Sequence, residues 1–597
     1  MTTDDDAAAA KLEKMTANLA RIEALSTRLM AALAQKKQSD PGVQGPGQDV
    51  YLKAAAAYLA GMMQNPAKVL EHQVAYWGKT MKHYVEAQQA LLKDGAAPAD
   101  SGPKDKRFSN PLWDSNPAFN YLKQQYLLNA EAVQTAVGDL ETIDPIDKQR
   151  VAYFTKQIVD MLSPTNFLGT NPDALEKALE TDGASLVQGL ENLVADIEAN
   201  NGEFAVTLAD PGAFTVGQNI ATTPGSVVFR NRLFELIQYK PTTETVYETP
   251  LLIFPPWINK FYVLDMKPSN SLIKWIVDQG FSLFVVSWVN PDASYADVGM
   301  DDYIREGFLT AMAEVRRITG EPQINAIGYC IAGTTLSLTL SHLQRAGDKT
   351  VKSATFFTTL TDFSDPGEVG VFLTDDFVDG IERQSHVDGM LSKTFMSRTF
   401  SYLRSNELIY APAIKSYMMG ETPPAFDLLY WNGDGTNLPC KMAIEYLRGL
   451  CQGDGLAQST FEVFGKKVSL ADIQIPVCAI ACETDHIAPW KASFNGFKQM
   501  GSKDKTFILS QSGHIAGIVN PPSKGKYGHY TNEGPVDGGP NDWLHGATFN
   551  QGSWWPRWST WLASQSGGQI PARQPGDSVR PILAAAPGSY VLAKPND

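Results

Sequence analysis

Cysteine is scarce in this chain, and its few cysteines lack the spacing of a disulfide framework. There are five among 597 residues, an odd number: Cys330, Cys440, Cys451, Cys478 and Cys482. A long chain with so few thiols is typical of a reducing compartment. Cys478 and Cys482 share the apolar run "PVCAIACETD", but no further Cys or His cluster completes a tetrahedral metal site. We interpret these two as small buried residues.

Basic charge and long apolar runs are lacking as well. Lys and Arg number 50 against 65 Asp and Glu, so the net charge of −15 argues against a broad nucleic-acid-binding surface. Apolar runs such as "FSLFVVSWV" fall well short of the ~20 residues that a membrane-spanning helix needs. The acidic start "MTTDDDAAAAKLEKM" does not resemble a secretory signal. We therefore expect a cytoplasmic protein with no nucleic-acid partner and no transmembrane segment.

The chain does contain enough apolar residues for a large core divided among several domains. Hydrophobic residues make up 43%, and a chain of this length forms about two to four domains. Residues 1–50 are rich in Ala and Lys and end near "SDPGVQGPGQD", which predicts a helical or mobile leader followed by a linker. Residues 51–200 carry apolar side chains at three- and four-residue intervals, as in "EHQVAYWGKTMKHYVEAQQALL". This pattern predicts a helical N-terminal domain, and we expect no catalytic residues there.

From about Thr243 onward, short apolar runs alternate with helical stretches. The runs lie in "TPLLIFPPWINKF", "GFSLFVVSWVN", "QINAIGYC", "KSATFFTTLTDF", "IPVCAIACETD" and "KTFILSQSGHIAG". Runs that read as buried on both faces predict a mostly parallel sheet in an α/β domain, which we place at 201–597. Few strand signals occur in the interval of about 362–470. We interpret it as a cap inserted over the carboxyl edge of the sheet.

The segment "GYCIAG" has the pattern of a nucleophile elbow with Cys330 at its apex. A buried strand precedes it and a helix follows. An elbow needs small residues two before and two after the nucleophile, and Gly328 and Ala332 meet that need. The thiol would lie near a helix N-terminus, which favours the thiolate. We predict that Cys330 is a nucleophile rather than a small buried residue.

Two residues downstream fit the acid and the base of a catalytic triad. Asp485 in "CETDHIAPW" and His514 in "SQSGHIAG" each follow a predicted strand, in the chain order nucleophile, acid, histidine. Three such residues at three strand ends are hard to obtain by accident. The remaining histidines that we weighed fit less well, because they lie beside the acid, in the helical region or down the elbow helix: His486, His72, His83 and His342.

An oxyanion hole needs two backbone N–H groups. One is predicted at Ile331, directly after the nucleophile. The other should come from "FPPWINKF", where the two prolines have no N–H and leave Trp257 or Ile258. We choose Ile258, and a rigid loop without chemistry is the alternative for this segment.

Several motifs together resemble the polyhydroxyalkanoate synthases, enzymes that polymerise hydroxyacyl-CoA thioesters. They are "GYCIAG", "PPWINKFYVLD", "SWVNPD", "WNGDGTNLP", "ETDHIAPW" and "SGHIAGIVNPP". The resemblance covers nearly all of the chain from about Asn201, and "NPLWDSNPAFNYLKQQYLL" extends it into the N-terminal helices. The family elbow usually reads G-x-C-x-G-G, and here Ala332 replaces the first of the paired glycines.

The resemblance implies an α/β-hydrolase fold with an inserted cap, preceded by an all-α N-terminal domain. It implies a Cys330–His514–Asp485 triad and a self-sufficient enzyme acting on short-chain (R)-3-hydroxyacyl-CoA. Trp431 matches a family tryptophan near the site and the subunit contact, although an ordinary buried aromatic residue is an equal alternative. Coenzyme A enters as part of the substrate, so we expect no separate cofactor and no metal. The further expected partners are the growing polymer, its granule surface and a second copy in a homodimer.

Thermochemistry explains why a thiol would suit this reaction. Transfer of an acyl group from coenzyme A to Cys330 exchanges one thioester for another, so the acyl group stays activated. Attack by a hydroxyl then forms an oxygen ester, which is downhill, whereas a serine would hold the acyl group as an ordinary ester.

Two rival functions share the same residues or fold: a cysteine-based α/β hydrolase such as a thioesterase, lactonase or depolymerase, and a non-catalytic granule protein.

Overall fold

The computed structural model divides the chain into two units. One unit comprises Met1–Asp210 and Arg398–Pro424, and the other comprises Pro211–Ser397 and Ala425–Asp597. We refer to them as the helical unit and the sheet unit. The structure describes residues 2–36, 52, 55–56, 59–61, 63–92, 105–140, 144–579 and 581–594.

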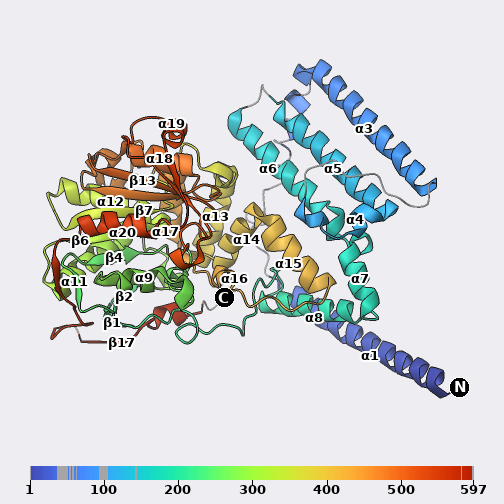
Figure 1. The fold of residues 1–597 in the computed structure, drawn as a ribbon, viewed down its shortest axis with the longest axis horizontal. Helices are drawn as coiled ribbons and strands as arrows, with labels where there is room; N and C mark the ends of the chain where they lie inside the picture. The colour runs from blue at the N-terminus through green and yellow to red at the C-terminus, as the bar shows by residue number, and fades with distance from the viewer. Residues whose placement is uncertain are drawn as a thin grey trace. The chain divides into compact units, whose positions relative to one another are not determined.

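The sheet unit is built on a mixed sheet of eleven strands (Figure 1). Its six central strands are parallel, and antiparallel strands extend it at both edges. The spatial order is β15 (Thr548–Asn550), β14 (His529–Thr531), β13 (Lys505–Ser510), β12 (Val477–Cys482), β7 (Val351–Phe357), β6 (Ile324–Tyr329), β4 (Leu251–Phe254), β5 (Leu283–Trp288), β2 (Phe234–Tyr239), β1 (Gly225–Arg230) and β17 (Ala584–Ala585). The six predicted apolar runs are the six parallel strands, so the predicted mostly parallel core of the sheet is confirmed.

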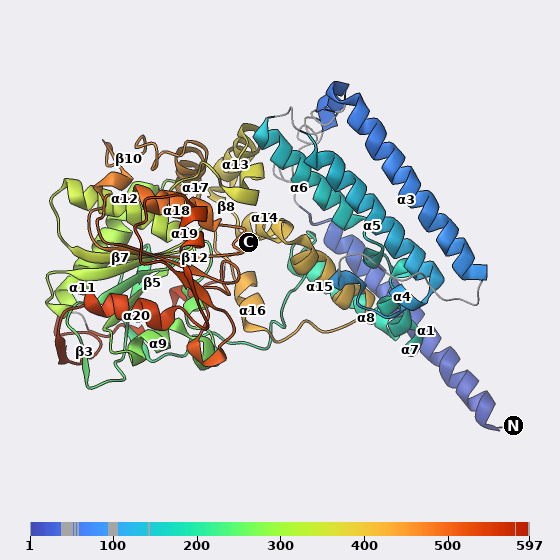
Figure 2. The same cartoon turned by 45° about the horizontal axis from the view of Figure 1, so that its top comes forward.

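Helices cover both faces of this sheet, as its central strands require when they are buried on both sides. Figure 2 shows α9 (Leu272–Asp278) and α20 (Trp555–Ser564) on one face and α12 (Ile331–Arg345) and α18 (Trp490–Gln499) on the other. On the first face the ring of Trp275 packs against that of Trp555, with centroids 5.4 Å apart. The remaining helices of this layer arrangement are α10 (Met300–Asp302), α11 (Thr310–Thr319) and α19 (Pro540–His545).

The chain between β7 and β12 forms the predicted insertion. In the sheet unit it contains α13 (Asp375–Asp388), α16 (Asp427–Gly433), α17 (Cys440–Ile444) and the π-helical turn η12 (Glu445–Gln452). Three further two-stranded ladders complete the unit: β3 (Thr245–Tyr247) with β16 (Gln569–Pro571), β8 (Met390–Leu391) with β9 (Leu438–Pro439), and β10 (Glu462–Val463) with β11 (Lys466–Lys467).

Several helices of the helical unit begin with the same local signal. An Asn or Asp side chain caps the first backbone N–H groups, and a proline occupies the first helical position. Asn116 does so for α5 (Pro117–Gly138), Asp144 for α6 (Pro145–Met161) and Asn171 for α7 (Pro172–Glu180). The other helices among the described residues of this unit are α1 (Thr2–Leu33), α3 (Pro66–Leu92), α4 (Leu112–Ser115), α8 (Ala184–Ala199), α15 (Ala411–Ala413) and the second half of α14 (Lys393–Leu403).

Two predicted boundaries differ from the structure. Part of the predicted leader, 1–50, is the helix α1, as its helical alternative expected, but this helix belongs to the helical unit. It packs on α8 through Leu25 and through ion pairs of Arg21 and Arg28 with Glu191 and Glu198. The apolar residues of both helices meet there, which the Ala- and Lys-rich composition of the leader did not reveal. The predicted linker at 37–50 lies outside the described residues.

The second difference concerns the cap, predicted at about 362–470. Its residues Arg398–Pro424 belong to the helical unit. The Asn192 side chain of α8 donates to the backbone carbonyls of Ser416 and Glu421, at 3.1 and 3.2 Å. The Tyr417 hydroxyl donates to Asp196 at 2.6 Å. Pairing of such distant segments has no local signal in the sequence.

Within the described ranges, no helix combines the length and the apolar character needed to cross a bilayer.

Candidate active site

Cys330 stands on the sharp turn between β6 and α12, as the elbow pattern predicts. Its backbone has φ 54° and ψ −124°, a conformation that is strained for any residue other than glycine. The Cys330 N–H donates to the Phe357 carbonyl of the neighbouring strand at 2.9 Å, and its carbonyl accepts from Gly333 N–H at 2.8 Å. Sheet and helix hydrogen bonds therefore hold the strained residue from both sides.

The small residues around Cys330 are required by close packing. A Cβ atom on Gly328 would lie 2.5 Å from Gly333 Cα, and one on Gly333 would lie 2.0 Å from Thr359 Oγ1. Ala332 is fully buried, so its methyl group is accommodated where the resembled family usually has glycine. The methyl group of Ala332 fits into the elbow because the positions without room for a Cβ atom are Gly328 and Gly333.

The loops after β12 and β13 bring Asp485 and His514 together. His514 Nδ1 lies 2.7 Å from Asp485 Oδ2, and both side chains are buried. The other carboxylate oxygen of Asp485 accepts from the N–H groups of Ile487 and Ala488 at 2.8 and 2.9 Å. Asp485 is thus fixed as an acceptor for Nδ1–H, which leaves Nε2 of His514 available to a second partner.

Charge favours the imidazolium form of His514. Burial lowers the pKa of the imidazole, but the carboxylate of Asp485 and the sulfur of Cys330 outweigh it, and together they raise the pKa of His514 to about 10. A hydrogen bond with Cys330 contributes to this shift. The structure therefore brings the three predicted residues into one array of thiol, imidazole and carboxylate.

The five cysteines differ in their exposure. Cys330 is partly exposed, whereas the other four are buried. Burial raises the pKa of each of the four buried thiols, which disfavours the reactive thiolate: Cys440, Cys451, Cys478 and Cys482. Cys478 and Cys482 lie within β12, which agrees with their interpretation as small buried residues.

The residues predicted for the oxyanion hole lie on two turns that follow central strands. Ile331 is the first residue of α12, where backbone N–H groups have no partner within the helix. Ile258 follows β4 in the loop "PPWINKF". Trp431 belongs to α16, is 4% exposed, and donates from Nε1 to the Lys260 carbonyl at 2.7 Å. Trp431 thus contacts the backbone of the same loop.

Two residues near Cys330 have no signal in the sequence that singles them out. Tyr446 and Cys451 of η12 hydrogen-bond to each other. Burial raises the pKa of the Tyr446 hydroxyl, and the nearby Cys451 and Cys330 side chains add to the effect. The cap therefore presents a phenol and a second thiol close to Cys330, which only the folded insertion reveals.

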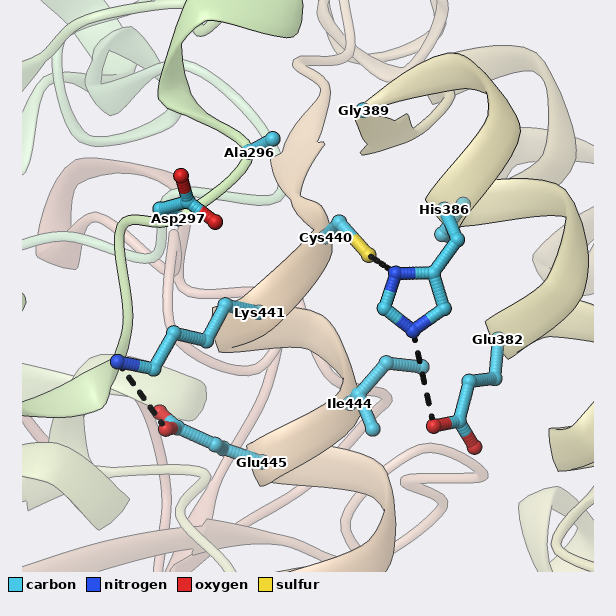
Figure 3. A pocket seen from close by; sticks show the side chains of 10 residues that line it. Ala296, Asp297, Glu382, His386, Gly389, Cys440, Lys441, Ile444 and Glu445 are labelled. Carbon is cyan, nitrogen blue, oxygen red and sulfur yellow. Dashed lines mark hydrogen bonds and ion pairs between the residues drawn. The ribbon is translucent and has the colours of Figure 1, made fainter.

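A second pairing of thiol and imidazole lines a cavity of about 330 Å³ between the cap and Ala296 and Asp297 of the segment after β5. Figure 3 shows the Cys440 sulfur facing the His386 ring and the Glu382 carboxylate beyond it. Cys440 Sγ is 3.5 Å from His386 Nδ1, and His386 Nε2 is 3.8 Å from Glu382 Oε1. Burial and the carboxylates of Glu382 and Asp297 raise the pKa of the Cys440 thiol. This environment opposes a thiolate nucleophile.

We expect Cys440→Ala to leave catalytic turnover unchanged and to cost about 1 kcal/mol of stability at most. Burial and the carboxylates of Glu382 and Asp297 disfavour the thiolate of Cys440, so this residue should take no part in catalysis. Turnover and thermal unfolding of the variant should be measured beside the wild-type protein. A folded Cys440→Ala protein without turnover would contradict the assignment of Cys330 as the single nucleophile.

Comparisons with known proteins match most of the chain. A family model described as the N-terminus of poly-beta-hydroxybutyrate polymerase (PhaC) matches residues 104–276, and one described as the alpha/beta hydrolase fold matches residues 250–521. Together with the sheet topology, the second model confirms the predicted α/β-hydrolase fold. A solved structure of a soluble variant of monoglyceride lipase from Saccharomyces cerevisiae is 10% identical. It covers 60% of this chain and 99% of its own, with a TM-score of 0.37.

Curated relatives extend over nearly the full length. The poly(3-hydroxyalkanoate) polymerase of Methylorubrum extorquens is 42% identical over 540 residues, which cover 89% of this chain and 88% of the relative. The poly(3-hydroxyalkanoate) polymerase subunit PhaC of Cupriavidus necator is 40% identical over 546 residues and 90% of each chain.

Proposed function

The chain belongs to the poly(3-hydroxyalkanoate) polymerases, and from this premise we propose that it polymerises short-chain (R)-3-hydroxyacyl-CoA, with 3-hydroxybutyryl-CoA as the preferred substrate, through a covalent thioester on Cys330. The observation that carries the proposal is the array of Cys330, His514 and Asp485 at the carboxyl edge of the sheet. The reaction releases coenzyme A. It requires no metal or further cofactor, because the thioester substrate is already activated.

In the first step, Cys330 becomes acylated. The proton of the thiol passes to His514, and the sulfur attacks the carbonyl carbon of the thioester. The N–H groups of Ile331 and Ile258 hold the oxyanion. Collapse of the tetrahedral intermediate breaks the bond to the coenzyme A sulfur, which leaves with the proton from His514 as free thiol. The acyl group stays on Cys330 as a thioester of nearly equal energy.

In the second step, a 3-hydroxyl group attacks the carbonyl carbon of the thioester on Cys330 and forms the oxygen ester of the polymer, while the bond from that carbon to the Cys330 sulfur breaks. The proton of the hydroxyl passes to a base, which returns it to the Cys330 sulfur, and two residues are candidates for this base. His514 can act directly, or Asp485 can take this role as the family resemblance implies while it orients His514. Asp485 is held by two backbone N–H groups and by His514, which supports its orienting role.

An assay with 3-hydroxybutyryl-CoA tests this function. Release of coenzyme A together with insoluble polymer supports the polymerase. Release with only free hydroxy acid would support a cysteine hydrolase such as a thioesterase or depolymerase, in which water replaces the hydroxyl. The absence of release would support a non-catalytic granule protein. A panel of acyl-CoA chain lengths then tests the short-chain preference.

The proposed partners include the polymer granule and a second copy of the chain, in the cytoplasm. Helix α3 supports this proposal, because one stripe of it carries apolar side chains that are about half to two-thirds exposed in the described part of the chain: Leu70, Val74, Trp77, Met81 and Tyr84. An apolar helical surface suits attachment to a hydrophobic polymer or to another subunit.

We expect deletion of residues 1–200 to weaken dimerisation and granule binding while the triad stays intact. Because Arg398–Pro424 loses α8 as its partner, the truncated protein should also be less stable. A matched control carries the same deletion and a Gly/Ser linker in place of 398–424. Sedimentation and co-pelleting with granules measure both effects. Dimers and granule binding equal to those of the full chain would refute the anchoring role.

A further inference from the structure

Thr436, in the motif "WNGDGTNLP", contacts the backbone of the loop that carries Ile258. It is 3% exposed and lies in the cap segment between α16 and β9. Its hydroxyl donates to the Trp257 carbonyl, and its N–H donates to the Ile258 carbonyl at 3.0 Å. One residue of the cap thus holds two consecutive carbonyl groups of this loop.

The geometry of the peptide bond makes the first of these contacts specific. The Trp257 carbonyl and the Ile258 N–H belong to the same peptide group. A trans peptide is planar, and its C=O and N–H point in opposite directions. When the Thr436 hydroxyl fixes the carbonyl, it therefore fixes the N–H of Ile258 on the opposite side of the loop.

We propose that Thr436 is a positioning residue that aims the Ile258 N–H at the developing oxyanion. This inference rests on the proposed function, in which that N–H stabilises the acylation step. An oxyanion donor is effective only when it is held in place before the charge develops. The hydroxyl of Thr436, rather than its methyl group, supplies the constraint.

Further contacts between the same two segments keep Thr436 in register with the loop. Gly435 and Asn259 form a β-bridge. Asp434 accepts from the ammonium of Lys260 and from the hydroxyl of Tyr262, both at 2.8 Å. The two residues before Thr436 thus attach the cap segment to the loop, so removal of the single hydroxyl should release one peptide group without undocking the cap.

The decisive variants remove or retain only the hydroxyl. Thr436→Val replaces it with a methyl group, and Thr436→Ser keeps it. Thr339→Val is a matched control, because Thr339 is also fully buried and its hydroxyl donates to a backbone carbonyl, that of Thr335, at 2.8 Å within α12. Thr436→Ala removes the same hydroxyl if the valine variant fails to fold.

The measurements are single-turnover release of coenzyme A from 3-hydroxybutyryl-CoA, KM and thermal unfolding. We expect Thr436→Val to slow acylation about 10- to 100-fold with little change in KM. Thr436→Ser should stay within about threefold of wild type, and so should Thr339→Val, because neither disturbs the held peptide.

Three outcomes would overturn the inference. Acylation by folded Thr436→Val or Thr436→Ala at the rate of Thr339→Val would show that the hydroxyl does not position the donor, while the proposed function stands. A serine variant as slow as the valine variant would show that packing matters instead. A wild-type protein that releases no coenzyme A would refute the proposed function, and the inference with it.

Discussion

Cys330→Ala is expected to abolish release of coenzyme A and polymer formation, by about 10⁴-fold or more. The substitution removes the nucleophile and changes little volume at the partly exposed end of the elbow. Alanine carries a Cβ atom as cysteine does, so the backbone strain at this positive φ is the same in the variant and in the wild type. The fold should therefore be retained. Steady-state release of coenzyme A, polymer mass and thermal unfolding should be measured together.

Cys330→Ser is the matched control for this variant. Its hydroxyl can accept an acyl group, but the product is an oxygen ester that no longer drives transfer to the next hydroxyl. We expect an acylated protein, visible by intact mass, that elongates poorly. Substantial polymer from Cys330→Ala would remove Cys330 from the mechanism.

His514→Gln is expected to slow acylation by about 10³-fold, because the thiol loses the base that accepts its proton. Glutamine keeps polar contact with Asp485 but cannot carry the proton. Release of coenzyme A in a single turnover isolates this step from elongation. Acylation at the wild-type rate would exclude His514 as the base.

Asp485→Asn is the companion variant, and it separates the two roles proposed for the carboxylate. His514 survives in it, so some acylation should remain, whereas elongation should fall further if Asp485 helps to deprotonate the 3-hydroxyl. The comparison is single-turnover release against steady-state polymer formation. Equal losses in both steps would leave Asp485 with the orienting role alone.

The central strands were predictable from the sequence because their residues carry a physical signal of their own. Runs such as Leu251–Phe254 and Val477–Cys482 are buried on both faces, so they are continuously apolar. The outer strands β14 and β15 were missed, since they are three residues long and carry polar side chains. Strands of that length are defined by their neighbours rather than by their composition.

The candidate site likewise contains residues that the sequence marks and residues that only the folded structure reveals. Cys330, Asp485 and His514 each follow a recognisable strand in a fixed chain order, so the sequence could place them at one edge. Thr436 could not be identified, because its importance comes from a contact with Trp257 in a different part of the chain. Tyr446 and Cys451 likewise approach Cys330 only once the insertion has folded.

The discontinuity of the helical unit has a consequence for synthesis on the ribosome. Its first segment, Met1–Asp210, emerges early, but the segment that hydrogen-bonds to α8 is translated only after residues 211–397. Until then Asn192 and Asp196 of α8 lack their partners in Arg398–Pro424. The helical unit therefore cannot finish folding before most of the central strands of the sheet unit have left the ribosome, and strict folding from the N-terminus, one domain after another, is excluded.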